Sequence, residues 1–592
     1  MSRPPFSRVL VANRGEIAVR VLRACRDLGI EGVAVYGPEE ERALHVQLAD
    51  DAYRIPSDAP IPYLDIPAVI AVAKQSGAEA IHPGYGFLSE NAAFAEACAD
   101  AGLVFVGPPP DAIRAMGEKI GSRVIAIRAG VPVVPGSDGP VASIEEAVAA
   151  SASIGFPLAV KASGGGGGRG FRVARTPEDL ADAFTGAVSE ATRSFAIPDV
   201  YLERYLDRAR HVEIQLIAGA DGEVVILGER DCSIQRRHQK LIEETPAPHY
   251  RDETRAAMFA AAVDLAKEVG YRNAGTIEFM LDADGSFHFL EMNTRIQVEH
   301  PISEAVTGLD LVTEQLRVAA GNPLSFTQSD VRPHGHAIEC RVNAEDPGRS
   351  FSPAPGRITA YRLPSGPGIR VESAFAGGSG PEMTIPTRYD SLIAKVVAWG
   401  RTRDEAIARM QRALAEFVVE GVPTTIPFHR NVLAHSAFVA GDVATTFITD
   451  HPEVIPPPST ITPDPGAETN PARDVITEVN GRRFVVRVSG LGEGNPGAGT
   501  QRRTPSRSAP KLPRASTPSP DGPEVPSPVQ GTVIRVVAAP GASVEVGTVL
   551  CVVEAMKMEN EVLAHRAGTV DAVLVEVGNS VKAGEIVARI TS

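Results

Sequence analysis

Hydrophobic and polar positions near the start of the chain change from one period to another and back. Arg8 to Ala12 is an almost continuous apolar run, Ile17 to Asp27 has apolar residues at helical spacing, and Gly32 to Tyr36 is apolar again. A strand, an amphipathic helix and a second strand in this order predict a βαβ unit with a parallel sheet. The Gly-x-Gly-x-x-Gly spacing of a dinucleotide-binding loop is absent from this unit, so we interpret it as a Rossmann-like scaffold layer.

The C-terminal part of the sequence contains an internal repeat. Gly531 to Val533 recurs as Gly568 to Val570, an offset of 37 residues from 531 to 568, and later glycines and valines recur with the same offset. Each half consists of short β runs broken by glycine turns, which predicts a pseudo-symmetric β sandwich. Glu554 to Asn560 joins the halves and places Lys557 between two methionines at a turn. A lysine at a turn is ordinarily only solvated, but its position at the symmetry centre predicts a handle for a modifying enzyme.

Proline marks the boundary before this repeat, because 16 of the 48 prolines fall within residues 452–528. Inside this stretch, Val475 to Val488 contains two β-rich runs around Asn480-Gly481, which predicts a small hairpin. Residues 492–524 are Gly, Pro, Ser, Thr and Arg with almost no large apolar residue. We interpret this segment as a solvated tether, with a basic docking patch as the alternative.

Length and composition restrict the class of protein. A chain of 592 residues is too long for one core and predicts about four domains. The five cysteines show no Cys-x-x-Cys spacing, which argues against a zinc site and a disulfide framework. A net charge of −15 gives no general attraction to nucleic acid or to anionic membranes, and no apolar run is long enough for a membrane span. We therefore expect a cytoplasmic protein that binds neither nucleic acid nor a membrane.

A glycine-rich loop between two predicted strands is the first candidate for chemistry. Pro157 to Lys161 precedes Gly164 to Gly170, and a second β run begins at Phe171. Consecutive glycines are costly to order, and backbone amides that approach phosphates are their natural use. The Gly-Lys-Ser/Thr ending of a P-loop is absent. We interpret the loop as a flexible flap over a nucleotide, with Lys161 as a phosphate-binding charge and a plain hairpin loop as the alternative.

Polar residues alternate with apolar ones from Phe289 to Glu299. If this segment is extended, its polar side chains share one face, which a solvent-facing edge strand would also explain. Glu278 lies in a second β run, Thr276 to Met280, and the two strands could bring Glu278, Glu291 and Asn293 together. Oxygen ligands of this kind suit Mg²⁺. Arg295 and Glu299 then remain for an anion and for a proton.

Three further segments are dense in hydrogen-bond donors and acceptors: Glu203 to Tyr205, His211 to Gln215 and Glu229 to Lys240. In isolation the last of these could be a nucleic-acid patch or an exposed loop. Taken together with a phosphate flap and a metal site, it indicates the wall of an anionic-substrate pocket.

These residues together resemble the biotin-dependent carboxylases. Residues 6 to about 450 are similar to a biotin carboxylase of the ATP-grasp superfamily, and residues 525–591 are similar to a biotinyl carrier domain with its Glu-Ala-Met-Lys-Met signature. The motifs that carry the resemblance are Ala12 to Ile17, His82 to Asn91, Lys161 to Gly170, Glu229 to Lys240, Glu291 to His300 and Glu339 to Arg341.

The resemblance implies a multidomain fold of the α/β and α+β classes that ends in an all-β sandwich. The expected parts are a Rossmann-like biotin carboxylase N-terminal domain (1–117), an ATP-grasp domain (118–330), a biotin carboxylase C-terminal domain (331–450), a Pro-rich linker with a small β element (451–524) and the biotinyl domain (525–592).

The resemblance also implies ATP-driven carboxylation of biotin, in which bicarbonate attacks the γ-phosphate and the carboxyl group of carboxyphosphate then reaches biotin. The cofactors would be biotin on Lys557, ATP, and Mg²⁺ or Mn²⁺. Glu299 would be the general base, and Arg341 would stabilise the biotin enolate. The other assignments are nucleotide binding by Lys119, Lys161, Gly166, Gly167, Glu203, His211, Gln235 and His238, metal binding by Glu278, Glu291 and Asn293, and bicarbonate binding by Lys240, Arg295, Gln297 and Val298.

The single-chain arrangement is similar to the alpha subunits of acyl-CoA carboxylases. It implies a carboxyltransferase beta subunit that acts on acetyl-CoA or propionyl-CoA, as in fatty acid biosynthesis, a biotin protein ligase, and a homo-oligomer within a hetero-oligomeric complex. Residues 451–524 are too few for a carboxyltransferase, so we expect the carrier to visit another polypeptide. The same half-reaction could instead serve pyruvate or methylcrotonyl-CoA carboxylation. A silent carboxylase that serves only as a carrier and a lipoyl carrier are the remaining alternatives.

Overall fold

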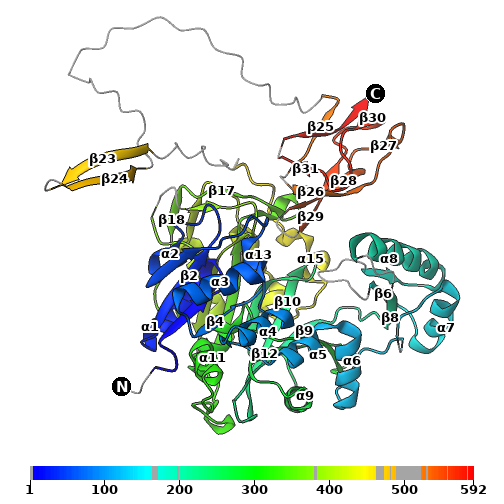
Figure 1. The fold of residues 1–592 in the computed structure, drawn as a ribbon. Helices are drawn as coiled ribbons and strands as arrows, with labels where there is room; N and C mark the ends of the chain where they lie inside the picture. Colours follow the sequence, from blue (N-terminus) through cyan, green and yellow to red (C-terminus); the bar gives the residue numbers. More distant parts are fainter. Residues whose placement is uncertain are drawn as a thin grey trace, which may run out of the picture.

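The computed structural model describes residues 4–461 without 138, 163–170, 196–198 and 379–382, the strand backbones 473–479 and 482–488, and residues 522–591 without 529–530, 556–557 and 583. A few further residues within helices and strands are described by their backbone alone. Figure 1 shows a large α/β body with a lobe of helices and short strands at one side and an all-β domain near the C-terminus. None of the helices in these ranges is both long and apolar enough to cross a membrane.

The N-terminal layer is a five-stranded parallel sheet in the order β3-β2-β1-β4-β5. It confirms the predicted βαβ unit. The helix of that unit begins earlier than predicted, at Gly15, whose positive φ of 62° provides the tight turn out of the first strand. The elements of this layer are β1 (Arg8–Val11), α1 (Gly15–Asp27), β2 (Glu31–Tyr36), α2 (Leu44–Leu48), β3 (Asp51–Arg54), α3 (Ile66–Ser76), β4 (Ala80–His82), α4 (Ala92–Asp100), β5 (Val104–Phe105) and α5 (Pro110–Gly117).

An antiparallel eight-stranded sheet forms the centre of the body, in the order β13-β12-β9-β10-β11-β14-β21-β19. It combines strands from the middle of the chain with strands that lie more than a hundred residues later. Side chains of both regions therefore meet on one sheet. The strands are β9 (Arg210–Ala218), β10 (Val224–Arg236), β11 (Gln239–Thr245), β12 (Asn273–Leu281), β13 (Phe287–Asn293), β14 (His336–Asn343), β19 (Ile369–Ser373) and β21 (Leu392–Gly400).

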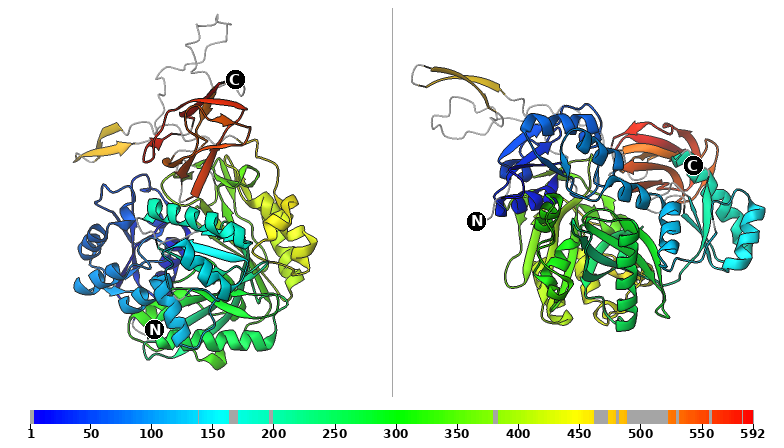
Figure 2. Two further views of the ribbon diagram at one scale, coloured as in Figure 1. Left: turned by 90° about the vertical axis from the view of Figure 1, so that its right-hand side faces the viewer. Right: turned by 60° about the horizontal axis from the view of Figure 1, so that its bottom comes forward.

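Helices cover both faces of this sheet. Helix α9 packs on β9 and β10, and α11 packs on β12. Helices α10 and α12 both pack on β14 and β21. Figure 2 shows the sheet and its covering helices from two further sides. The helices are α6 (Lys119–Arg128), α9 (Asp252–Glu268), α10 (His300–Thr307), α11 (Leu311–Ala319), α12 (Arg403–Glu416), α13 (Ile426–Ala434), α14 (Ser436–Val439) and α15 (Phe447–Asp450).

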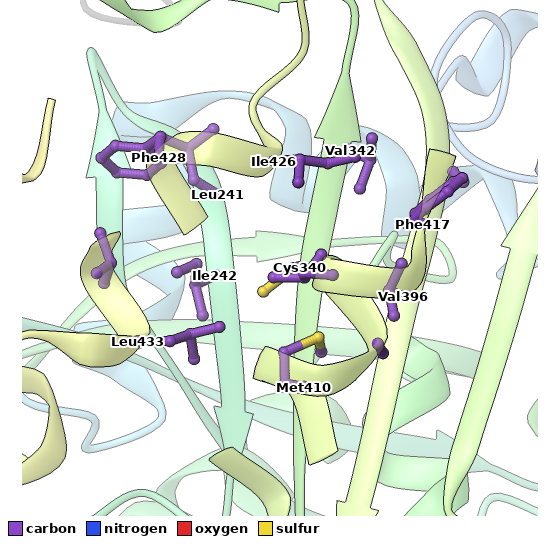
Figure 3. Close-up of a cluster of buried hydrophobic side chains, with 14 of the residues drawn as sticks. Leu241, Ile242, Cys340, Val342, Val396, Met410, Phe417, Ile426, Phe428 and Leu433 are labelled. Carbon is purple, nitrogen blue, oxygen red and sulfur yellow. The ribbon is translucent and has the colours of Figure 1, made fainter. Parts of the chain in front are cut away.

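Alternation along β14 and β21 separates an apolar face from a charged one. Cys340 and Val396 are fully buried and pack with Met410 of α12, as Figure 3 shows. Neighbours in sequence point to the opposite face, where Val397 contacts the α10 side. Arg341 and other charged residues of β14 and β21 therefore lie on the α10 face, and the close-packed cluster on the other face fixes their position.

A small three-stranded sheet, in the order β7-β6-β8, forms the lobe seen at the right of Figure 1. The predicted strand–loop–strand unit is present here, because β6 and β7 pair antiparallel on either side of the glycine-rich loop. The loop itself, residues 163–170, lies outside the described residues. The lobe consists of α7 (Ile144–Ile154), β6 (Leu158–Ala162), β7 (Phe171–Ala174), α8 (Leu180–Phe195) and β8 (Val200–Arg204).

The extended segment that we predicted from Phe289 to Glu299 is only partly a strand. Strand β13 ends at Asn293, and residues 294–299 form a loop that leads into α10. The backbone N–H of Thr294 donates to Glu90 Oε1 at 3.0 Å rather than to a neighbouring strand, which ends the ladder. The prediction that Arg295, Gln297 and Glu299 share one strand face is therefore wrong. We call residues 294–299 the anion loop.

The C-terminal domain is the predicted sandwich, built from the two four-stranded sheets β25-β32-β30-β27 and β29-β28-β26-β31. Strands of the two halves begin with the predicted offset of 37 residues, as in β26 at 531 and β30 at 568. The predicted hairpin is present as the antiparallel pair β23 (Arg473–Val479) and β24 (Arg482–Val488). The sandwich strands are β25 (Glu524–Pro526), β26 (Gly531–Val536), β27 (Ser543–Val544), β28 (Val549–Ala555), β29 (Met558–Leu563), β30 (Gly568–Val573), β31 (Ser580–Val581) and β32 (Ile586–Thr591).

Candidate active site

A cavity of about 810 Å³ lies where the N-terminal layer, the small lobe and the central sheet meet. Side chains from all three parts line it, so its shape depends on how the parts pack. Most residues that the sequence singled out lie on its wall: Lys161, Glu203, His211, Gln235, His238, Lys240, Glu278, Glu291, Asn293, Arg295, Gln297, Val298 and Arg341.

Four residues of the prediction lie wholly or partly beyond what the structure describes. Gly166, Gly167 and Lys557 are outside the described residues, and Lys119 is described only by its backbone, as the first residue of α6. Strands β28 and β29 on either side of Lys557 pair antiparallel through Ala555 and Met558.

The predicted metal ligands come together on two paired strands at the floor of the cavity. Glu278 on β12 lies opposite Glu291 on β13, and Asn293 follows two residues later on the same edge. Asn293 Nδ2 donates to Glu278 Oε1 at 2.8 Å. Two carboxylates and one amide oxygen, in a cavity wide enough for phosphate and water, form a donor set that fits Mg²⁺.

One end of the cavity carries cations around a buried carboxylate. Lys161 Nζ on β6 donates to Glu203 Oε2 on β8 at 2.5 Å, and Arg123 Nη1 donates to Glu203 Oε1 at 3.3 Å. Glu203 therefore holds two cations in place at a point where phosphate oxygens could replace it. Arg123 escaped the sequence analysis, because nothing in the pattern of α6 separates it from an ordinary helical arginine.

Glu299 does not itself line the cavity: it is fully buried behind Lys240 and Arg341, which do. Lys240 Nζ donates to Glu299 Oε1 at 2.7 Å, and Arg341 Nη2 donates to Glu299 Oε2 at 2.9 Å. Lys240 also donates to Glu278 Oε1 at 2.8 Å and to Glu213, so it links the base position to the metal position.

The charges around Glu299 shift its pKa strongly. Burial by itself would raise the pKa of Glu299, but Lys240, Arg341 and Arg230 outweigh burial and hold that pKa well below its usual range. Burial would likewise lower the pKa of Lys240, but the three surrounding carboxylates raise it well above its usual range. Both groups are therefore charged at any working pH in the state described.

Arg295 is held in the anion loop by three side chains. Its Nε donates to Glu90 Oε2, its Nη1 to Gln297 Oε1 and its Nη2 to Asn293 Oδ1, each at 2.8 Å. A guanidinium fixed in this way presents a fork to a small planar anion. Glu90 lies in a motif that the sequence analysis quoted, but its partner is 205 residues away and could not be read from the sequence.

Sequence reasoning also missed a buried network behind Lys240. Arg230 is fully buried, and its Nε donates to Glu213 Oε1 at 2.5 Å while its Nη1 donates to Gln215 Oε1 at 2.6 Å. Polar residues at every second position of the otherwise apolar strand β9, from His211 to Gln215, were a usable signal. Alternation of this kind inside a buried strand indicates a polar network and not a solvent face.

Four families match successive parts of the chain: "Biotin carboxylase, N-terminal domain" over residues 5–113, "Carbamoyl-phosphate synthase L chain, ATP binding domain" over 118–327, "Biotin carboxylase C-terminal domain" over 339–450 and "Biotin-requiring enzyme" over 523–590. The biotin-dependent acyl-coenzyme A carboxylase alpha3 subunit of Mycobacterium leprae is 45% identical over 99% of this chain and 98% of its own length. The chain belongs to the biotin carboxylase family. This biotin carboxylase is fused to its own biotinyl domain, and its cofactors are biotin, ATP and Mg²⁺.

Two further relatives match only the biotin carboxylase part. A pyruvate carboxylase subunit of Methanothermobacter thermautotrophicus is 52% identical over 75% of this chain and 90% of its own length. The biotin carboxylase domain of the 2-oxoglutarate carboxylase of Hydrogenobacter thermophilus, solved with MgADP, ADP and bicarbonate, is 47% identical with a TM-score of 0.73, over 76% of this chain and 99% of that one. The predicted fold and the predicted ATP-dependent carboxylation of biotin are confirmed.

Proposed function

We propose that this biotin carboxylase binds bicarbonate between Lys240, Arg295, Gln297 and Val298, with Glu299 as general base. The observation that carries the proposal is the position of Glu299, which lies between Lys240 and Arg341 beside the predicted metal ligands. A small anion that enters here meets two fixed cations and one carboxylate, which is the set needed to bind bicarbonate and remove its proton.

The depressed pKa of Glu299 is compatible with this role. In the described state, Lys240 and Arg341 form ion pairs with carboxylates, including that of Glu299. A bound bicarbonate competes for the same cations, which weakens their hold on Glu299 and raises its pKa towards that of an effective base. Arg341, which keeps its charge throughout, then stabilises the enolate form of biotin.

Glu278, Glu291 and Asn293 would hold Mg²⁺, which would neutralise charge on the transferring phosphoryl group. Of these ligands, Glu278 also contacts His211 and Lys240 in the described state, so metal binding would replace part of that network. Lys161, Glu203, Gln235 and His238 line the nucleotide end of the cavity, and Lys119 and the Gly166–Gly167 flap complete the proposed ATP site.

The experiment for this site replaces Glu299 with glutamine in the biotinylated full chain. Glu299→Gln should bind MgATP nearly as well as the parent but lose bicarbonate-dependent ATP cleavage by about 10² to 10⁴ in rate, the usual worth of a general base. Glu420→Gln, at an exposed position of β22 (Val418–Glu420), is the matched control and should behave as the parent. A Glu299→Gln chain with near-parental turnover would mean that another group takes the proton.

The proposed partner is a separate carboxyltransferase beta subunit that acts on acetyl-CoA or propionyl-CoA. The whole-length match to an acyl-CoA carboxylase alpha subunit supports this acceptor, whereas the pyruvate carboxylase match stops at the biotin carboxylase part. A biotin protein ligase would attach biotin to Lys557, and the chain would form a homo-oligomer within the complex.

Radiolabelled bicarbonate tests the acceptor. With the purified chain alone, label should reach protein-bound biotin but no acyl-CoA, and with an added beta subunit it should appear in malonyl-CoA or methylmalonyl-CoA. Label in an acyl-CoA product from the single chain would contradict the separate subunit. Label transferred only to pyruvate or methylcrotonyl-CoA would favour the alternative acceptors.

A further inference from the structure

Lys395 is a fully buried lysine on the face of β21 that packs beneath α10. It lies on β21 directly opposite Arg341 of β14, and its side chain has no exposed surface. Val397, the next residue on the same face, is also buried and contributes to an apolar cluster beneath α10. Burying an ammonium group is costly unless it is paired and hydrogen-bonded, so a structural role alone would be filled better by methionine.

The contacts of Lys395 connect the N-terminal layer to the anion loop. Its Nζ donates to the backbone oxygen of Val298 at 2.8 Å and lies 3.1 Å from Glu16 Oε2 at the start of α1. The Tyr85 hydroxyl donates to the other oxygen of Glu16. Glu16, Tyr85 and Val298 all line the active-site cavity, whereas Lys395 lies behind it.

The anion loop needs such a support, because it leaves the sheet ladder at Asn293. Beyond that residue, the Thr294 N–H is fixed by Glu90, and the Val298 carbonyl is fixed by Lys395. Val298 and Glu299 share one peptide unit, so the direction of that carbonyl also sets the backbone from which the Glu299 side chain departs.

We propose that Lys395 is a positioning residue for the bicarbonate site, with Glu16 as its counter-charge. Lys395 touches no substrate; it holds the Val298–Glu299 peptide so that the loop groups and Glu299 face the anion together. The inference rests on the proposed bicarbonate site. Its consequence is that Glu16, in the N-terminal layer, contributes to bicarbonate use although it is distant in sequence from every proposed bicarbonate ligand.

The test replaces Lys395 with methionine in the biotinylated full chain and measures KM for bicarbonate and for MgATP separately. Misplacing a reacting group by about 1 Å costs roughly 10²-fold, so kcat/KM for bicarbonate should fall by about that factor. KM for MgATP should stay close to the parental value, because the nucleotide contacts lie elsewhere in the cavity. Glu16→Gln should have a smaller effect, because it leaves the Lys395–Val298 hydrogen bond in place.

The double variant Glu16→Gln/Lys395→Met separates positioning from folding. It leaves no buried carboxylate without its counter-charge, so it should regain any thermal stability that Lys395→Met loses, but not the bicarbonate kinetics. If Lys395→Met does not fold, the double variant carries the test with the same expectation. The inference would be overturned if Lys395→Met, once folded, had the parental kcat and KM for bicarbonate. It would also be overturned if the double variant had both parental values.

Glu299→Gln, measured alongside, separates a failure of the role of Lys395 from a failure of the proposed bicarbonate site. An inactive Glu299→Gln beside a normal Lys395→Met would overturn the role of Lys395 alone. An active Glu299→Gln would overturn the proposed bicarbonate site on which that role depends.

Discussion

Replacing Glu339 with glutamine is expected to make the protein relatively more stable as the pH rises. Glu339 is fully buried on β14, both of its carboxyl oxygens are without a hydrogen-bond partner within the described ranges, and Glu243 lies directly across the sheet on β11. Burial raises the pKa of Glu339 well above its usual range; Lys395 opposes this shift and Glu243 adds to it. Glu339 therefore holds a proton where an exposed glutamate would have lost it.

The size of the effect follows from proton linkage. Between the unfolded and the folded pKa, the folded chain holds one proton more than the unfolded chain, so its free energy of unfolding falls by about 1.4 kcal/mol per pH unit. Burial also raises the pKa of Glu243 to about 7, against the opposing charge of Arg341, so Glu243 adds an equal slope up to that pH. The slope of Glu339→Gln should therefore be shallower than that of the wild type by about 1.4 kcal/mol per pH unit, because Glu243 and the other titrating groups contribute to both chains.

Urea unfolding between pH 5 and pH 7 measures this difference directly. Trp399, the single tryptophan of the chain, lies on β21 opposite Ala337 of β14, two residues from Glu339, so its fluorescence reports on the relevant sheet. Glu420→Gln, on an exposed position, should show a constant difference from the wild type. A constant difference for Glu339→Gln as well would mean that Glu339 ionises normally, and a variant that loses stability as the pH rises would mean that its carboxylate forms a stabilising pair.

Two further predictions concern the cofactors. Glu291→Gln should raise the Mg²⁺ concentration needed for ATP cleavage, because one ligand charge is lost at the metal; a magnesium titration identical to that of the parent would show that Glu291 is not a ligand. Lys557 should be the only biotinylated residue, so Lys557→Arg should abolish the mass increase of biotin in the intact protein; biotin on another lysine, or lipoate on Lys557, would contradict the assignment.

Periodicity predicted the parts of the fold that depend on local sequence. The first βαβ unit, the hairpin around 480–481 and the 37-residue repeat were all found where the pattern placed them, because each is specified by neighbouring residues. The continuation of β13 to Glu299 was predicted wrongly, because the Thr294 N–H donates to Glu90 Oε1 and not to a neighbouring strand. The alternation of polar and apolar residues could not reveal a hydrogen-bond partner about two hundred residues away.

The candidate site shows the same division. Residue types and the family resemblance selected the groups that line the cavity, such as Lys240 and Arg341. The supports behind them were not predicted, because Lys395 and Glu16 gain meaning only when β21 and α1 meet beside the anion loop. A buried lysine in an apolar strand is the one local signal that could have drawn attention to this pair.

The pseudo-twofold symmetry of the sandwich also relates its two ends to each other. Val552 lies opposite Glu561 in the β28–β29 pair, and Arg589, the same 37 residues later, lies opposite Glu524 in the β32–β25 pair. The symmetry therefore exchanges the β28–β29 connection, which contains Lys557, with the gap between the last strand and the first. A circular permutant that joins 591 to 524 and opens the chain at Lys557 would keep every strand pair. Strand β25, where the sandwich begins, therefore lies at the end of the domain that corresponds by symmetry to the β28–β29 connection. A biotin on Lys557 would be carried at that other end, so the length of the sandwich would add to its reach.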